Sequence, residues 1–121
     1  IDPNNQQALV VYILALTDQL GLSNVKLSHK KITETINRLD SEFERHYYTG
    51  IFLERKARGL LKHSMSHSFA YKGLMEAIAK YEIAEEMAPK HCSDPILRYN
   101  SCLRTIEKEG LKPREEFDEL F

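Results

Sequence analysis

The stretch AIAKYEIAEEMAP, from Ala77 to Pro89, decides the fold class of this chain. Ala77, Tyr81 and Ala84 recur at intervals of three and four, which is the period of an α-helix with one buried face. Pro89 cannot continue a helix, so this helix is expected to end just before it. A similar proline-containing ending opens the chain, at residues 1–5. We infer that the chain is built from helical hairpins closed by such turns.

The other apolar residues also follow the helical period, and the sequence contains little of the turn chemistry of β-hairpins. Gly21 is expected to follow the end of the first helix, Ser28 to cap the start of the second, and Asp94 to cap the fifth. The sequence therefore predicts one all-α domain over residues 1–121, taken as a fragment of a longer chain. Its five or six helices are expected over residues 5–19, 29–39, 41–62, 68–87, 94–110 and 114–120.

Composition places the chain among ordinary globular domains. It has 121 residues, 42% of them hydrophobic and 29% charged, and a formal net charge of −1. That charge argues against a protein whose main task is to bind nucleic-acid phosphates. No apolar run approaches the roughly 20 residues that span a bilayer. Cys92 and Cys102 form no CxxC pair, so a reduced, cytoplasmic setting is expected.

The helix that ends at Pro89 resembles the second helix of a tetratricopeptide repeat, which carries alanine, then an aromatic residue four positions later, then a closing proline. Tyr99, Cys102, Leu103 and Ile106 resemble a degraded copy of the first-helix signature of the same repeat. The expected helix pairs are longer than the repeat's roughly 34 residues, so the resemblance is to a divergent member. The segment 94–102 is also similar to a segment of bacterial proteins of unassigned role. The resemblance implies an antiparallel helix-turn-helix stack, an α-solenoid.

A stack of this kind implies a scaffold that binds a protein or peptide and has no catalytic activity, cofactor or metal of its own. In such stacks the first helix of each pair lines the concave face, where aromatic residues and arginine supply contact area and directed hydrogen bonds. The expected partner-binding residues are Tyr48, Phe52, Arg55, Asn100 and Arg104.

The first helix also suggests self-association. Its apolar residues cannot all face the second and third helices, and an uncovered apolar strip usually finds a partner surface. A homodimer through an open end, or contact with a preceding repeat, is therefore expected. The residues concerned are Leu9, Tyr12, Ile13 and Leu16.

Three further patterns allow other interpretations. Arg58 and His63 match the short Arg-x4–6-His signature of HEPN ribonucleases, in which an arginine can stabilise charge while a histidine moves a proton, so a small helical ribonuclease is the alternative function. His63 and His67 have metal-ligand spacing, but a turn is expected between them. The acidic and apolar tail at 115–121 fits either a capping helix or a segment that docks on another protein.

Overall fold

The chain is all-helical in the part that the computed structural model describes, residues 2–20 and 25–114. This part contains no strand, so the predicted all-α class is confirmed. The expected cap at Gly21 and residues 115–120 of the expected last helix lie outside the described residues. The helices are α1 (Gln6–Asp18), α2 (Val25–Asn37), α3 (Glu42–Leu60), the short 3₁₀ helix η1 (Ser64–Ser66), α4 (His67–Met87) and α5 (Asp94–Lys108).

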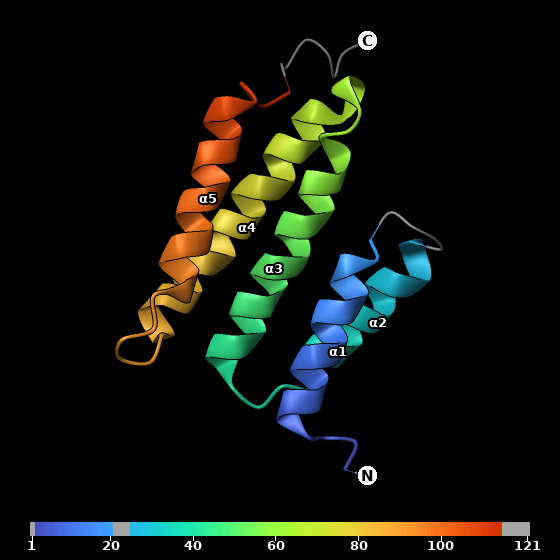
Figure 1. Ribbon diagram of the computed structural model, residues 1–121, viewed down its shortest axis with the longest axis vertical. Coiled ribbons are helices and arrows are strands. Elements are labelled where there is room, and N and C mark those ends of the chain that lie inside the picture. Colours follow the sequence, from blue (N-terminus) through green and yellow to red (C-terminus); the bar gives the residue numbers. More distant parts are fainter. Residues whose placement is uncertain (1, 21–24, 115–121) are drawn as a thin grey trace.

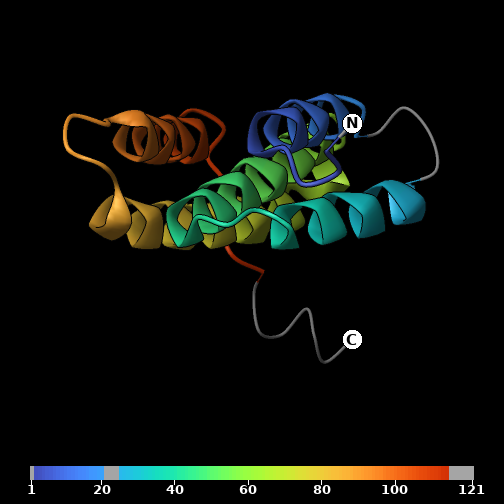
Figure 2. The ribbon, with the colours of Figure 1, turned by 90° about the horizontal axis from the view of Figure 1, so that it is seen from below.

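The long helices α3 and α4 form the centre of the molecule (Figure 1). They run in opposite directions and are joined through η1. On one side α5 packs against α4, and on the other α1 and α2 pack against each other and against α3. Figure 2 shows α1 and α5 on one side of the molecule and α2 and α4 on the other.

Local sequence signals account for most helix ends. The Asn5 side chain accepts a hydrogen bond from the Ala8 N–H at 3.0 Å, and Ser41 accepts one from the Glu44 N–H at 3.2 Å. Both are N-caps that satisfy a backbone donor at a helix start.

Two predicted N-caps are wrong. Ser28 is not the N-cap of α2, because that helix begins at Val25 and contains Ser28. Asp94 is likewise the first residue of α5 rather than its cap. Proline is tolerated at any position in the first turn of a helix, because the N–H groups there have no helical acceptor. The proline after Asp94 therefore does not show which residue before it is the N-cap.

The hydrophobic core has two parts. One lies between α3, α4 and α5, and it contains Leu74, Ala77, Ile78 and Tyr81 of the predicted inner face of α4, with Ala84 also buried. Ala88, predicted for the same face, follows the end of the helix and is only half-buried. The other lies between α1, α2 and α3 and consists of Leu9, Ile13, Ile32, Ile36 and Leu39. Tyr48 packs against both. Tyr12, which was predicted to belong to the apolar strip of α1, is exposed, as is its neighbour Val11.

Glycine allows α3 and α4 to approach closely. A Cβ atom built on Gly50 would lie only 2.5 Å from Cε1 of Tyr81, and one on Gly73 would lie 2.8 Å from the Cβ of Ala57. Neither distance leaves room for an ordinary carbon–carbon contact. By contrast, a Cβ on Gly59, which is also in α3, would meet no atom within 4 Å.

These environments predict opposite effects for the same substitution in one helix. Gly50→Ala should lower the free energy of unfolding by about 1–3 kcal/mol, because the methyl group forces the buried Tyr81 ring aside. Gly59→Ala should raise it by about 0.5–1 kcal/mol, because alanine loses less backbone entropy in a helix than glycine does. Urea denaturation of the two variants measures both values. Shifts of the same sign would contradict the proposed close contact.

His29 joins α2 to α3 through an apolar contact. Its ring meets the Phe52 ring edge-on, with 5.1 Å between centroids. The His29 Nε2 atom is buried and has no hydrogen-bond partner. Burial, with a smaller contribution from the Lys56 ammonium group, lowers the pKa of His29 below the ordinary histidine value. The folded chain therefore favours the neutral imidazole.

The domain should lose stability on acidification because of His29. Its pKa is lower in the folded chain than in the unfolded chain, so the unfolded chain binds the proton more readily below pH of about 6.5. Above that value both states are neutral and the effect vanishes. His29→Leu should flatten the fall in melting temperature between neutral and mildly acidic pH, whereas the same change at the exposed His63 should not. Equal pH slopes for the parent and His29→Leu would refute this assignment.

Candidate functional site

A buried carboxylate lies at the junction of three helices. Glu54, on α3, is only 1% exposed, and an isolated buried charge would be very costly. Three donors surround it. The Tyr81 hydroxyl donates to Oε1 at 2.7 Å, Arg58 Nε donates to Oε2 at 2.7 Å, and Arg98 reaches the same oxygen at 3.5 Å. Tyr81 belongs to α4 and Arg98 to α5, so this carboxylate joins α3 to both other helices.

Arg58 extends the network along α5. Its two terminal nitrogens donate to Thr105 Oγ1 at 2.7 Å and to Ser101 Oγ at 3.0 Å. Burial, followed by the nearby Glu54 carboxylate, raises the pKa of the Cys102 thiol to about 12. Because the thiolate is the nucleophilic form, Cys102 is an inert core residue. The same two causes raise the pKa of Tyr81, so its hydroxyl remains a hydrogen-bond donor.

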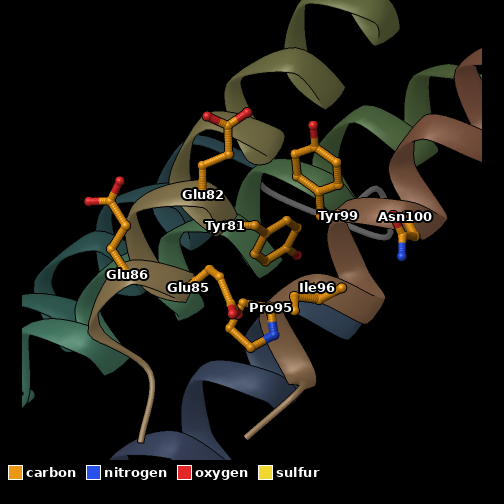
Figure 3. Close-up of a pocket in the computed structure, with 8 residues that line it drawn as sticks. All are labelled: Tyr81, Glu82, Glu85, Glu86, Pro95, Ile96, Tyr99 and Asn100. Atoms are coloured by element: carbon orange, nitrogen blue, oxygen red, sulfur yellow. The ribbon is translucent and has the colours of Figure 1, made fainter.

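The other side of Tyr81 faces a groove. The groove is open to solvent, lies between α4 and α5 and has a volume of about 400 Å³. Tyr81 is fully buried, so its ring forms part of the floor, and its hydroxyl is held in place by Glu54. The residues that line the groove are Tyr81, Glu82, Glu85 and Glu86 from α4 and Pro95, Ile96, Tyr99 and Asn100 from α5 (Figure 3).

The two walls of the groove differ in chemistry. On α4, Glu82, Glu85 and Glu86 are exposed and share one helix face, since they are spaced at three and four residues. None of them forms an ion pair within the described ranges. On α5, Ile96 is 44% exposed and Tyr99 is half-buried. In Figure 3, Glu82 and Tyr99 stand on opposite sides of the Tyr81 ring. The groove is therefore acidic on one side and largely apolar on the other.

The predicted contact residues of α3 hold helices together. The Arg55 guanidinium donates to Thr17 Oγ1 at 2.7 Å and to Asp18 Oδ1 at 2.6 Å, both on α1. Phe52 packs on His29, and the Lys56 ammonium group lies 5.9 Å from its ring centroid. Tyr48 bridges the two core clusters. These three side chains therefore attach α1 and α2 to α3.

The predicted residues of α5 separate. Asn100 lines the groove between α4 and α5, whereas Arg104 lines a different hollow, along α5, with Ser101, Thr105, Glu107 and Lys108. The structure thus brings one of the five predicted residues to this groove. The sequence could have indicated the acidic wall, because its three glutamates follow Tyr81 on the predicted helix with the clearest pattern.

The predicted pair Arg58 and His63 occupies two different environments. The Arg58 guanidinium is bonded to Glu54, Ser101 and Thr105, while His63 is exposed just before η1. His67 Nε2 lies 3.2 Å from the Leu61 carbonyl oxygen. Over residues 2–20 and 25–114, no group of three or more histidine, cysteine or acidic side chains is placed to hold a metal ion. In the same ranges, no helix is long and apolar enough to cross a bilayer.

The hydroxyl of Tyr81 should contribute measurably to stability. Tyr81→Phe keeps the ring but leaves Glu54 Oε1 without its donor, which should cost about 1–3 kcal/mol. Tyr71→Phe is the matched control on α4. The Tyr71 side chain is half-buried and forms no hydrogen bond with the rest of the described residues, so its change should stay within about 0.5 kcal/mol. Tyr81→Ala removes the ring as well and should cost about 3–5 kcal/mol. Chemical denaturation would disprove the role of the hydroxyl if both phenylalanine variants matched the parent.

Comparison with protein-family models, with curated proteins and with solved structures found no match for this chain. Its function therefore has to be inferred from the geometry of the groove and of the network beneath it.

Proposed function

We propose that this chain is a protein-interaction module that holds a segment of another protein in the groove between α4 and α5 and has no catalytic activity of its own. The observation that carries the proposal is the groove itself, whose volume of about 400 Å³ lies in the range typical of ligand sites. Its exposed apolar wall beside polar residues is characteristic of interaction surfaces. The Glu54 network fixes its floor, so little ordering is needed when a partner binds.

The resemblance to tetratricopeptide repeats supports the same conclusion. We propose that α1 with α2 and α3 with α4 are two divergent helix pairs of an antiparallel stack, the second of them long, and that α5 begins a third. In this arrangement the groove lies where one pair meets the next helix along the stack. Asn100, predicted as a contact residue, belongs to it.

The ribonuclease alternative is less well supported. A catalytic arginine has to reach the reacting phosphate, but the nitrogens of Arg58 donate hydrogen bonds to Glu54, Ser101 and Thr105. The contacts with Ser101 and Thr105 join α3 to α5, which is a structural task. We therefore prefer binding to catalysis.

A displayed library of random peptides tests the groove. Peptides selected on the parent domain should bind Ile96→Glu at least about tenfold more weakly, a loss of about 1.4 kcal/mol, because a charge then occupies the apolar wall. Leu97→Glu is the matched control. Leu97 is 60% exposed, adjacent on α5 and outside the groove lining, so its variant should bind as the parent does. Fluorescence anisotropy gives both affinities.

The proposal fails if the library yields no binder. It fails equally if both glutamate variants bind the selected peptides alike. Circular dichroism of each variant confirms that a loss of binding does not reflect unfolding.

A further inference from the structure

The acidic wall of the groove destabilises the helix that carries it. Glu82 and Glu86 are four residues apart on α4, and Glu82 and Glu85 are three apart, so their charges face one another along one side of the helix. Like charges at these spacings destabilise a helix. Within the described residues no lysine, arginine or histidine pairs with any of the three. Among the residues that the structure describes, the repulsion is therefore left uncompensated.

The position of these acids adds a second, independent cost. Glu85 and Glu86 lie in the last turn of α4, which ends at Met87 and has no basic residue there. The carboxyl end of a helix carries partial negative charge from its unpaired carbonyl groups, so it favours cations and disfavours carboxylates. The helix end and the three side chains thus act in the same direction. Both favour a cationic group at this end of the groove.

The opposite wall selects for apolar groups. Ile96 offers exposed aliphatic surface, and Tyr99 presents an aromatic ring on the same side of α5 (Figure 3). An aromatic face also attracts a lysine or arginine side chain that lies over it. The combination is complementary to a ligand with apolar residues on one side and basic residues on the other.

We propose that the groove binds a basic amphipathic helix from a partner protein. This deepens the proposed function, on which it rests. In this complex the apolar residues of the partner helix pack on Ile96 and Tyr99. Its lysine or arginine residues, spaced one turn apart, face Glu82, Glu85 and Glu86, which have the same spacing along α4. An acidic helix is excluded, because it would bring like charges together beside an uncompensated acidic wall.

Three labelled peptides of one design test the charge preference. Each is a short amphipathic helix with leucine on one face, and lysine, glutamine or glutamate occupies the other face. The lysine peptide should bind the parent domain at least about tenfold more tightly than the glutamine peptide, and its affinity should fall as salt is raised. The glutamate peptide should not bind. Fluorescence anisotropy across a range of salt concentrations provides these comparisons.

Two triple variants assign the preference to the groove. Replacing Glu82, Glu85 and Glu86 by glutamine should weaken the lysine peptide at least about tenfold and remove most of its salt dependence. It should also raise the melting temperature of the free domain, because the repulsion along α4 is gone. The matched control replaces three exposed glutamates elsewhere and changes the net charge equally, and it should leave the affinity unchanged. The control residues are Glu34, Glu76 and Glu107.

The outcomes separate the two levels of the proposal. If the glutamine peptide binds as tightly as the lysine peptide and Ile96→Glu abolishes both, the groove binds helices but the preference for basic partners is wrong. If no peptide binds, while library selection still yields groove binders, the helical ligand is wrong. If neither the peptides nor the library gives a binder, the interaction module itself is refuted.

Discussion

The Glu54 carboxylate is the constraint on which the arrangement of α3, α4 and α5 depends. Once it is buried, its negative charge has to be balanced, and donors from all three helices do so. The arrangement is demanding because each donor needs a particular helix position. A shift of α5 along α4 would carry Arg98 away from the carboxylate. A rotation of α4 would carry the Tyr81 hydroxyl away from the carboxylate.

Apolar packing alone tolerates such shifts, whereas a buried charge that loses a hydrogen-bond donor strongly destabilises the fold. The network thereby specifies one register among several that the hydrophobic core would permit.

The attachment of α1 and α2 has a different character. Their contact with α3 relies on the smaller core cluster, on Tyr48 and Phe52, and on the Arg55 guanidinium, which joins the Asp18 carboxylate at the end of α1. The Asp18 side chain is 70% exposed, and ion pairs in water contribute little. The α1–α2 pair is therefore held mainly by apolar contacts, and the more firmly specified half of the molecule is the half that carries the groove.

Helical periodicity was enough to predict the class, the order of the five α-helices in the described ranges and most of the buried face of α4, but not the short helix η1. Those features follow from residues close together in sequence. The groove could not be predicted in the same way. Its walls come from two helices, and which residues of α4 and α5 face each other depends on how the two helices are aligned.

Glu54 shows the difficulty most clearly. A glutamate between Leu53 and Arg55 indicates a solvent-exposed position, and only its three donors from α3, α4 and α5 explain its burial. Tyr99 was predicted only as part of a first-helix signature. It packs against the core, yet it also lines the groove.

The two faces of Tyr81 have a consequence for how this surface can evolve. Its hydroxyl belongs to the buried network and its ring to the floor of the groove, so the floor is fixed by the requirements of folding. The walls are not. Glu82, Glu85, Glu86 and Ile96 are exposed, and exchanging them leaves the network untouched. Under the proposed function, sequence drift at these positions can therefore redirect the choice of partner from one lineage to another while the scaffold stays constant. Related chains would be expected to share the residues around Glu54 and to differ along the rim.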